Sequence, residues 1–63
     1  MSYTTWILPH PGSPWEPRYT LHNVSEAEAV TAGMMWHADL LARGGASERL
    51  SRVATLAMDK VPQ

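Results

Sequence analysis

The sequence predicts a small α+β domain in the order ββαα, a β-hairpin followed by a two-helix hairpin. Three observations predict it: an N-terminal region rich in β-branched and aromatic residues, a capped helical segment in the middle of the chain, and a second serine-led segment after a glycine pair. A chain of 63 residues is enough for one domain, 1–63, and the absence of cysteine excludes stabilisation by disulfides.

The hairpin is predicted over residues 3–22. Residues 3–8, YTTWIL, have the composition of a strand, and the loop sequence PHPGSP follows them. Apolar and polar residues alternate over 15–22, where Pro17 lacks a backbone donor and indicates an edge strand. The inner face of the hairpin then combines apolar side chains of both strands: Trp6, Leu8, Trp15, Tyr19 and Leu21. An extended, unpaired proline-rich arm is the alternative.

The first helix is predicted over residues 25–43. Ser25 is followed three residues later by Glu28, the spacing of a capping box in which each residue satisfies a free backbone donor of the other. Gly44 follows the last helical residue and suits the left-handed conformation that ends many helices.

The second helix is predicted over residues 47–60. Ser47 is a good N-cap, and Glu48 places an acid in the first turn, where the helix dipole favours negative charge. Pro62 follows and cannot continue a helix. These signals complete the predicted ββαα order.

The stretch GMMWH, residues 33–37, places four bulky side chains in a row inside the first helix. Consecutive helical residues point about 100° apart, so these side chains cannot share one face. Two apolar stripes result. The first comprises Ala27, Val30, Met34, Ala38 and Leu41. The second comprises Ala29, Gly33, Trp36 and Leu40, with Met35 at its edge.

A helix with two apolar stripes has two packing partners. We expect the first stripe to pack on the hairpin, with Val30, Met34 and Leu41 against its inner face. The second stripe then faces either the second helix of the same chain or another protein chain. A large tryptophan among small residues is typical of an interface hot spot. The predicted protein-binding residues are Trp36, Leu40, Met35, Gly33 and Ala29.

No motif in the sequence predicts catalysis, and we expect no enzyme, no cofactor and no metal site. There is no nucleophile elbow or glycine-rich phosphate loop, and His10, His22 and His37 have no metal-binding spacing. The net charge of −1 gives little attraction to nucleic acid or an anionic membrane. Because no apolar run could span a membrane and the N-terminus lacks the basic region of a signal peptide, we expect a cytoplasmic protein.

The function favoured by these observations is that of a small protein-binding module: an adaptor, an inhibitor or an accessory subunit of a larger assembly. Its size and composition also fit a virus-encoded modulator. A single core in so short a chain seldom supplies more than about 3–5 kcal/mol, so burial against another protein chain has value for stability. That partner is either a different protein or a second copy in a homo-oligomer.

The alternative function is that of a small DNA-binding regulator. Residues 40–53, LLARGGASERLSRV, resemble the helix-turn-helix motif, with Arg43, Arg49 and Arg52 as the residues that would contact DNA. The resemblance departs from the motif at Leu40 and Gly45, and no third helix precedes the pair.

Overall fold

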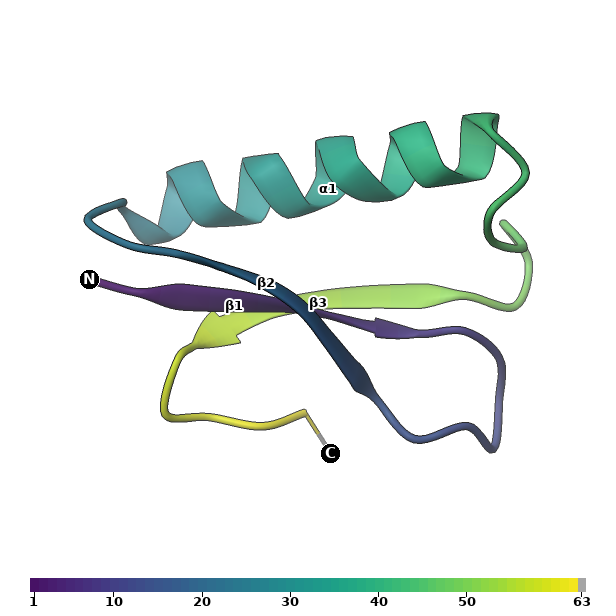
Figure 1. The fold of residues 1–63 in the computed structure, drawn as a ribbon, viewed down its shortest axis with the longest axis horizontal. Helices are drawn as coiled ribbons and strands as arrows, with labels where there is room; N and C mark the ends of the chain where they lie inside the picture. Colours follow the sequence, from purple (N-terminus) through teal and green to yellow (C-terminus); the bar gives the residue numbers. More distant parts are fainter. Residues whose placement is uncertain (63) are drawn as a thin grey trace.

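The computed structural model describes residues 1–62, which form a three-stranded antiparallel sheet with one helix across one face (Figure 1). The elements follow in the order ββαβ: β1 (Tyr3–Leu8), β2 (Glu16–Leu21), α1 (Glu26–Ala42) and β3 (Arg52–Ala57). The strand order across the sheet is β2-β1-β3, so the first strand of the chain is the central one. The predicted α+β class, the hairpin and the first helix are confirmed.

The predicted second helix, 47–60, is wrong, because residues 52–57 in the middle of this segment form β3. The serine signal marks one turn only: the Ser51 N–H donates to the Ser47 carbonyl at 2.8 Å, and the Leu50 N–H donates to Ser47 Oγ at 3.3 Å. The strand RVATLA that follows pairs with the whole length of β1. Tertiary pairing therefore overrides the local helix preference of its alanine, leucine and arginine residues.

The central strand β1 pairs with β2 on one side and with β3 on the other, which excludes the unpaired arm considered above. Two pairs of threonines join the strands. The hydroxyls of Thr4 and Thr20 lie 2.8 Å apart, and those of Thr5 and Thr55 lie 3.1 Å apart. Such cross-strand hydrogen bonds fix the register of both neighbours.

A β-bulge interrupts β2, and the register of the hairpin overturns its predicted inner face. Thr5 lies opposite Tyr19 but Trp6 lies opposite Pro17, so Arg18 is the extra residue. The alternation predicted over 15–22 therefore does not continue through the strand. Because Thr5 faces the helix, alternation along β1 places Trp6 on the opposite face of the sheet, where Leu8 follows it.

The helix α1 begins and ends where the sequence predicts. The Glu28 N–H donates to Ser25 Oγ at 3.1 Å, and the Ser25 N–H donates to Glu28 Oε1 at 3.0 Å, which completes the capping box. The hydrogen bond from the Ser25 N–H, together with the Ser25 side chain, lowers the pKa of the Glu28 carboxyl. At the other end Gly44 has φ +76°, and its N–H donates to the Leu41 carbonyl.

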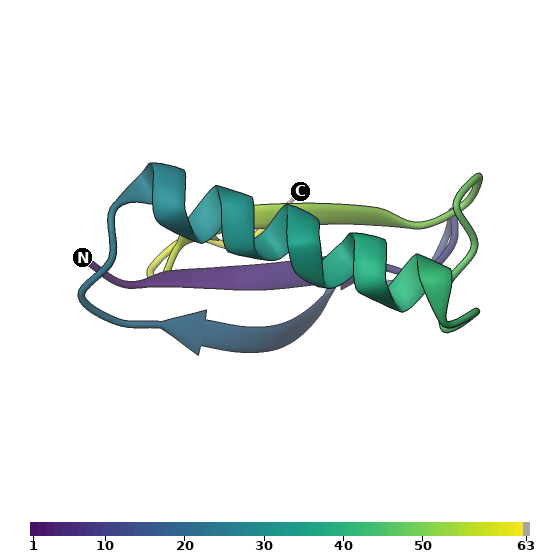
Figure 2. The same ribbon diagram turned by 90° about the horizontal axis from the view of Figure 1, so that it is seen from above.

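The two stripes of α1 are interchanged relative to the prediction. Ala29 and Gly33 are buried against the sheet, whereas 64% of Met34 and 38% of Val30 are exposed. The reason is Gly33: a Cβ there would lie 2.5 Å from Thr55 Oγ1 and 3.2 Å from Thr5 Oγ1. The missing side chain lets the helix lie close over β1 and β3, and the glycine face becomes the core face (Figure 2).

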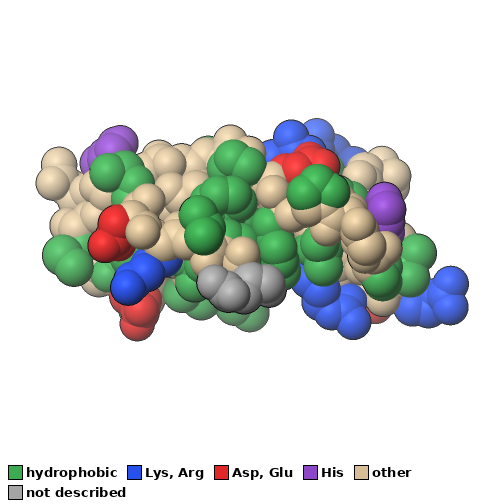
Figure 3. All heavy atoms as spheres, turned by 90° about the horizontal axis from the view of Figure 1, so that it is seen from below, with side chains coloured by type: hydrophobic (Ala, Val, Ile, Leu, Met, Phe, Trp, Pro, Cys, Tyr) green, Lys and Arg blue, Asp and Glu red, His purple; other side chains and the backbone are tan. Residues whose placement is uncertain are grey.

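The buried core is small and partly polar. Its apolar members are Tyr3, Ile7 and Ala29, and the largest side chains with less than 2% exposure are those of Thr5 and Ser51. The face of the sheet opposite α1 also carries apolar side chains, which gather near its middle (Figure 3). The segment after β3 runs back beneath this face (Figure 1). On this side the Trp6 indole N–H is buried and has no acceptor among residues 1–62.

Candidate functional sites

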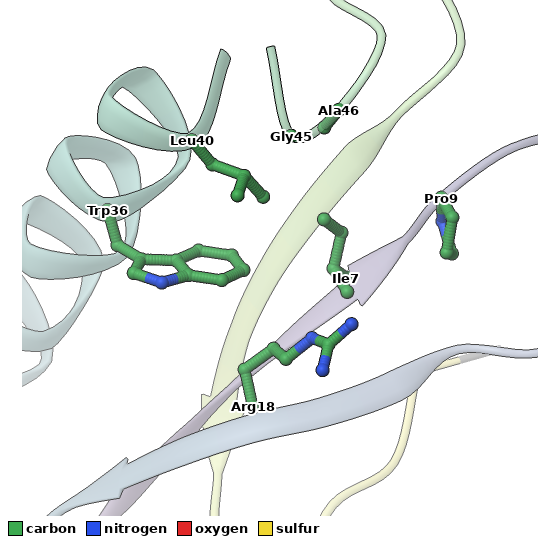
Figure 4. Close-up of a pocket in the computed structure, with 7 residues that line it drawn as sticks. All are labelled: Ile7, Pro9, Arg18, Trp36, Leu40, Gly45 and Ala46. Carbon is green, nitrogen blue, oxygen red and sulfur yellow. The ribbon is translucent and has the colours of Figure 1, made fainter. Parts of the chain in front are cut away.

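The side of α1 that faces β2 borders a partly open pocket of about 330 Å³ (Figure 4). It holds two of the predicted binding residues, Trp36 and Leu40. The Trp36 ring packs edge-on against Tyr19 of β2, with ring centroids 5.9 Å apart. The pocket is lined by Ile7, Pro9, Arg18, Trp36, Leu40, Gly45 and Ala46. The two predicted residues therefore help to hold the helix on the sheet and also form a cavity wall.

Arg18 is the only charged residue among those lining the pocket, and the bulge in β2 directs its side chain toward Ile7 (Figure 4). Its guanidinium donates to Glu16 Oε1 at 2.9 Å. Both side chains are almost half exposed, so this ion pair contributes little to stability. The pocket therefore offers one guanidinium that is paired with a carboxylate of the same strand, and no other charged group of residues 1–62 lines it.

The other three predicted binding residues lie in different environments. Ala29, 1% exposed, and Gly33 are buried between helix and sheet, so another protein cannot reach them in this fold. Met35 is 68% exposed and points to solvent. The sequence groups all five residues through their helical spacing, but the structure separates them because Gly33 turns their stripe toward the sheet.

A second surface, which the sequence predicts to lie in the core, is found where α1 borders β3. His37 Nε2 and Ser51 Oγ are 2.9 Å apart, and Ser51 directly precedes β3, so the His37 side of the helix faces this strand. Val30, Leu41 and Met34 lie progressively further round the helix from His37, by about 20° to 60° at 100° per residue. We call Val30, Met34 and Leu41 the α1 flank. It is apolar and mostly exposed.

Beside the α1 flank, β3 presents an unpaired backbone edge. The Met58 N–H donates to the Ser2 carbonyl, so in the antiparallel ladder the backbone groups of Val53 and Thr55 point away from β1. The hydroxyl contact between Thr5 and Thr55 agrees, because side chains approach most closely in pairs without backbone hydrogen bonds. Within residues 1–62 these outward N–H and C=O groups have no partner. We call them the β3 edge.

The residues of the DNA-binding alternative do not form a recognition helix. Residues 40–53 contain the end of α1, a turn and the start of β3, so the predicted second helix that would carry Arg49 and Arg52 is absent. Arg43 pairs with Asp39 at 3.0 Å, and the Arg52 guanidinium donates to the carbonyls of Arg49 and Ser51. The resemblance to a helix-turn-helix motif ends at the glycine turn.

Across residues 1–62 no three His, Asp or Glu side chains lie close enough to hold a metal ion. Nor does this part of the chain contain a helix with the length and hydrophobicity needed to cross a membrane. The chain matches no protein-family model, no curated protein and no solved structure. The α1 flank and the β3 edge are the two surfaces of residues 1–62 that are suited to contact another protein chain.

Proposed function

We propose that this chain is a small, non-catalytic protein-binding module that presents the β3 edge and the α1 flank to another protein. One observation carries the proposal: an unpaired strand edge and an exposed apolar helix stripe lie side by side. An extended segment of a partner can add to such an edge through main-chain hydrogen bonds. Apolar side chains of the partner can then cover Val30 and Met34.

The apolar composition of the α1 flank supports this role. Met34 has 64% of its surface exposed, and methionine is common on binding surfaces because its flexible thioether adapts to different partners. The small core adds a reason for binding, since burial of the flank removes apolar surface from water. An adaptor, an inhibitor and an accessory subunit all use a surface of this kind.

The proposal is tested with the tagged chain as bait for binding proteins, comparing Met34→Glu with Met35→Glu. These neighbours are matched controls: both are exposed methionines in mid-helix, and their side chains point about 100° apart. We expect the unchanged chain and Met35→Glu to capture one protein in stoichiometric amount, either a different protein or an untagged copy of the chain, and Met34→Glu to lose it. Loss with Met35→Glu but not with Met34→Glu contradicts the proposed surface and favours the one predicted from the sequence.

A further inference from the structure

We propose that the partner strand is β3 of a second copy of this chain. Two copies then form one antiparallel six-stranded sheet, with a two-fold axis near Thr55 and both helices on the same face. This inference rests on the proposed function, because it names the partner of the same surface. Four properties of the surface support a copy of itself as the occupant.

The first property is the hydrogen-bonding pattern of the β3 edge. In an antiparallel pair centred on Thr55, each Thr55 lies opposite the Thr55 of the other copy, and Val53 lies opposite Ala57. The outward N–H groups of these three residues then meet outward carbonyls. The Ala57 carbonyl already accepts from the Lys60 N–H at 2.8 Å, and its second lone pair stays available.

The second property is the position of α1 over the sheet. Gly33 lies against both Thr5 of β1 and Thr55 of β3, so the helix lies over the space between these strands (Figure 2). With strands about 4.8 Å apart, two-fold pairing through β3 places the two helices about 9.6 Å apart. This spacing falls within the roughly 8–10 Å of packed helices. The helices of the two copies therefore contact each other without moving on their own sheets.

The third property is that the α1 flank of each copy then faces the flank of the other. A two-fold interface uses the same patch on both subunits, so the patch must complement itself. Val30, Met34 and Leu41 are all apolar, and the flexible side chain of Met34 lies near the axis, because its neighbour Gly33 lies against Thr55. The seam is therefore apolar around the axis, where Met34 meets the Met34 of the other copy and Val30 lies one turn away.

The fourth property is the placement of charge along β3. Residues 53–57 carry no charge, so no like charges oppose each other across the pair. Arg52 begins the strand and Asp59 follows its end. Lys60 adjoins Asp59, so the charges at this end nearly cancel. Antiparallel pairing keeps the Arg52 of one copy away from that of the other, whereas a parallel pair in register would place the two directly opposite each other, which favours the antiparallel orientation.

The area required is modest for this chain. A stable interface buries about 1,200 Å² in total, or about 600 Å² from each copy. That is about one-seventh of the 4309 Å² that one chain exposes. The edge extends along β3 and the flank from Val30 to Leu41 of α1, and their burial supplements a core whose largest fully buried side chains are Thr5 and Ser51.

The test uses the full chain, which has no native cysteine. Single-cysteine variants Met34→Cys and Met35→Cys are oxidised at micromolar concentration and examined under non-reducing conditions. We expect a disulfide-linked dimer from Met34→Cys and none from Met35→Cys, because only residue 34 lies at the seam. In parallel, sedimentation equilibrium of the unchanged chain is expected to show a dimer. Met34→Glu should raise its dissociation constant about tenfold or more, and Met35→Glu should leave it unchanged.

Hydrogen exchange gives an independent measurement. The Val53 and Thr55 amides should exchange slowly in the dimer and rapidly in Met34→Glu. A chain that stays monomeric at all concentrations, with rapid exchange at both amides, overturns the inference, and so does cross-linking through residue 35 rather than 34. If that monomer still captures a different protein through Met34, the self-pairing is wrong while the proposed function stands. If it captures nothing through Met34, both are wrong.

Discussion

The two outer strands of the sheet both pair with β1, yet they differ in how their free edges are protected. β2 carries Pro17, which has no N–H to offer, a bulge at Arg18, and the ion pair of Arg18 with Glu16. Prolines, bulges and charges are the devices by which proteins block addition of another strand. β3 has none of these between Val53 and Ala57. The β2 edge therefore has three features that block the addition of another strand, and the β3 edge has none.

The free edge of β3 is therefore not a consequence of the small size of the sheet, because β2 in the same sheet is protected. Unpaired strand edges can pair with other chains, and the features of β2 limit such pairing on its side of the sheet. The elements above the sheet follow the same division. The pocket of Trp36 and Leu40 lies toward the closed edge, whereas the exposed α1 flank borders the open one. We therefore assign binding to the β3 side and structural closure to the β2 side.

The largest expected effect comes from the strand that holds both edges. Ile7 is 3% exposed and lies on β1 between Glu16 and Val53. Ile7→Ala should cost about 2–5 kcal/mol of unfolding free energy, enough to unfold so small a domain. Leu8→Ala, at the end of the same strand and only partly buried, should cost less. Urea denaturation followed by circular dichroism measures both, and equal losses contradict this account of the core.

A pair of prolines tests the open edge directly. Val53→Pro removes an outward N–H and leaves the ladder with β1 intact, so it converts β3 into a strand protected as β2 is. Ala54→Pro removes an N–H that points toward β1, and the carbonyl it leaves unpaired should cost about 1–3 kcal/mol. Thermal melts should show Ala54→Pro as the less stable variant. If Val53→Pro is equally unstable, the Val53 N–H points inward and the β3 edge is misassigned.

Gly33 places α1 close to β3, so the α1 flank lies beside the β3 edge. Substitution of Gly33 has a smaller expected effect on stability. A Cβ at this position meets the hydroxyl of Thr55, and such overpacking costs about 1–3 kcal/mol. Alanine is the better helix former by about 1 kcal/mol, which offsets part of the cost. Gly33→Ala should therefore lower stability by about 0–2 kcal/mol in urea denaturation. A clear gain in stability contradicts the close contact of α1 with β3.

The sequence predicts the features of this fold that depend on neighbouring residues, and it does not predict those that depend on residues far apart in the chain. The hairpin, the edge position of β2 and the extent of α1 follow from local chemistry: prolines, alternation and the capping box of Ser25 with Glu28. The identity of β3 does not, because RVATLA suits either a helix or a strand until β1 offers a free edge. Nor does the orientation of α1. Gly33 signals a close approach, but only the positions of Thr5 and Thr55 show that the approach is to the sheet.

The candidate site reflects the same limit. Helical spacing correctly separates two apolar stripes, and nothing in the spacing says which one faces inward. The stripe with Trp36 has the larger side chain and the smaller neighbours, which fits a hot spot and a close-packed core equally well. The sequence does not predict the β3 edge, since the local signals of residues 47–60 predict a helix where the strand forms.

The smallest expected effect comes from changes at the start of α1. The first turn of this helix supports the Val30 end of the α1 flank and lies away from the β2 edge. The pKa of Glu28 is lowered mainly by the hydrogen bond its carboxylate accepts from the Ser25 N–H. The contribution of this bond to stability is complete above the unfolded-state pKa of about 4.5. It is lost as the pH falls through the lower pKa of the folded state. Acid should therefore loosen the first turn of the helix before the sheet.

Three variants sharpen this expectation. Ser25→Ala should cost about 1 kcal/mol at neutral pH, because it removes the acceptor for the Glu28 N–H. Glu28→Gln should flatten the loss of stability on acidification, since a neutral amide does not titrate. Glu26→Gln removes a carboxylate from the same turn without touching the capping box, and should keep the slope of the unchanged chain. Urea denaturation across the acidic range measures all three, and equal slopes for the two glutamine variants contradict the role of Glu28. If stability still falls with pH in Glu26→Gln but not in Glu28→Gln, the acid sensitivity comes from the capping box, which begins the helix that carries the α1 flank.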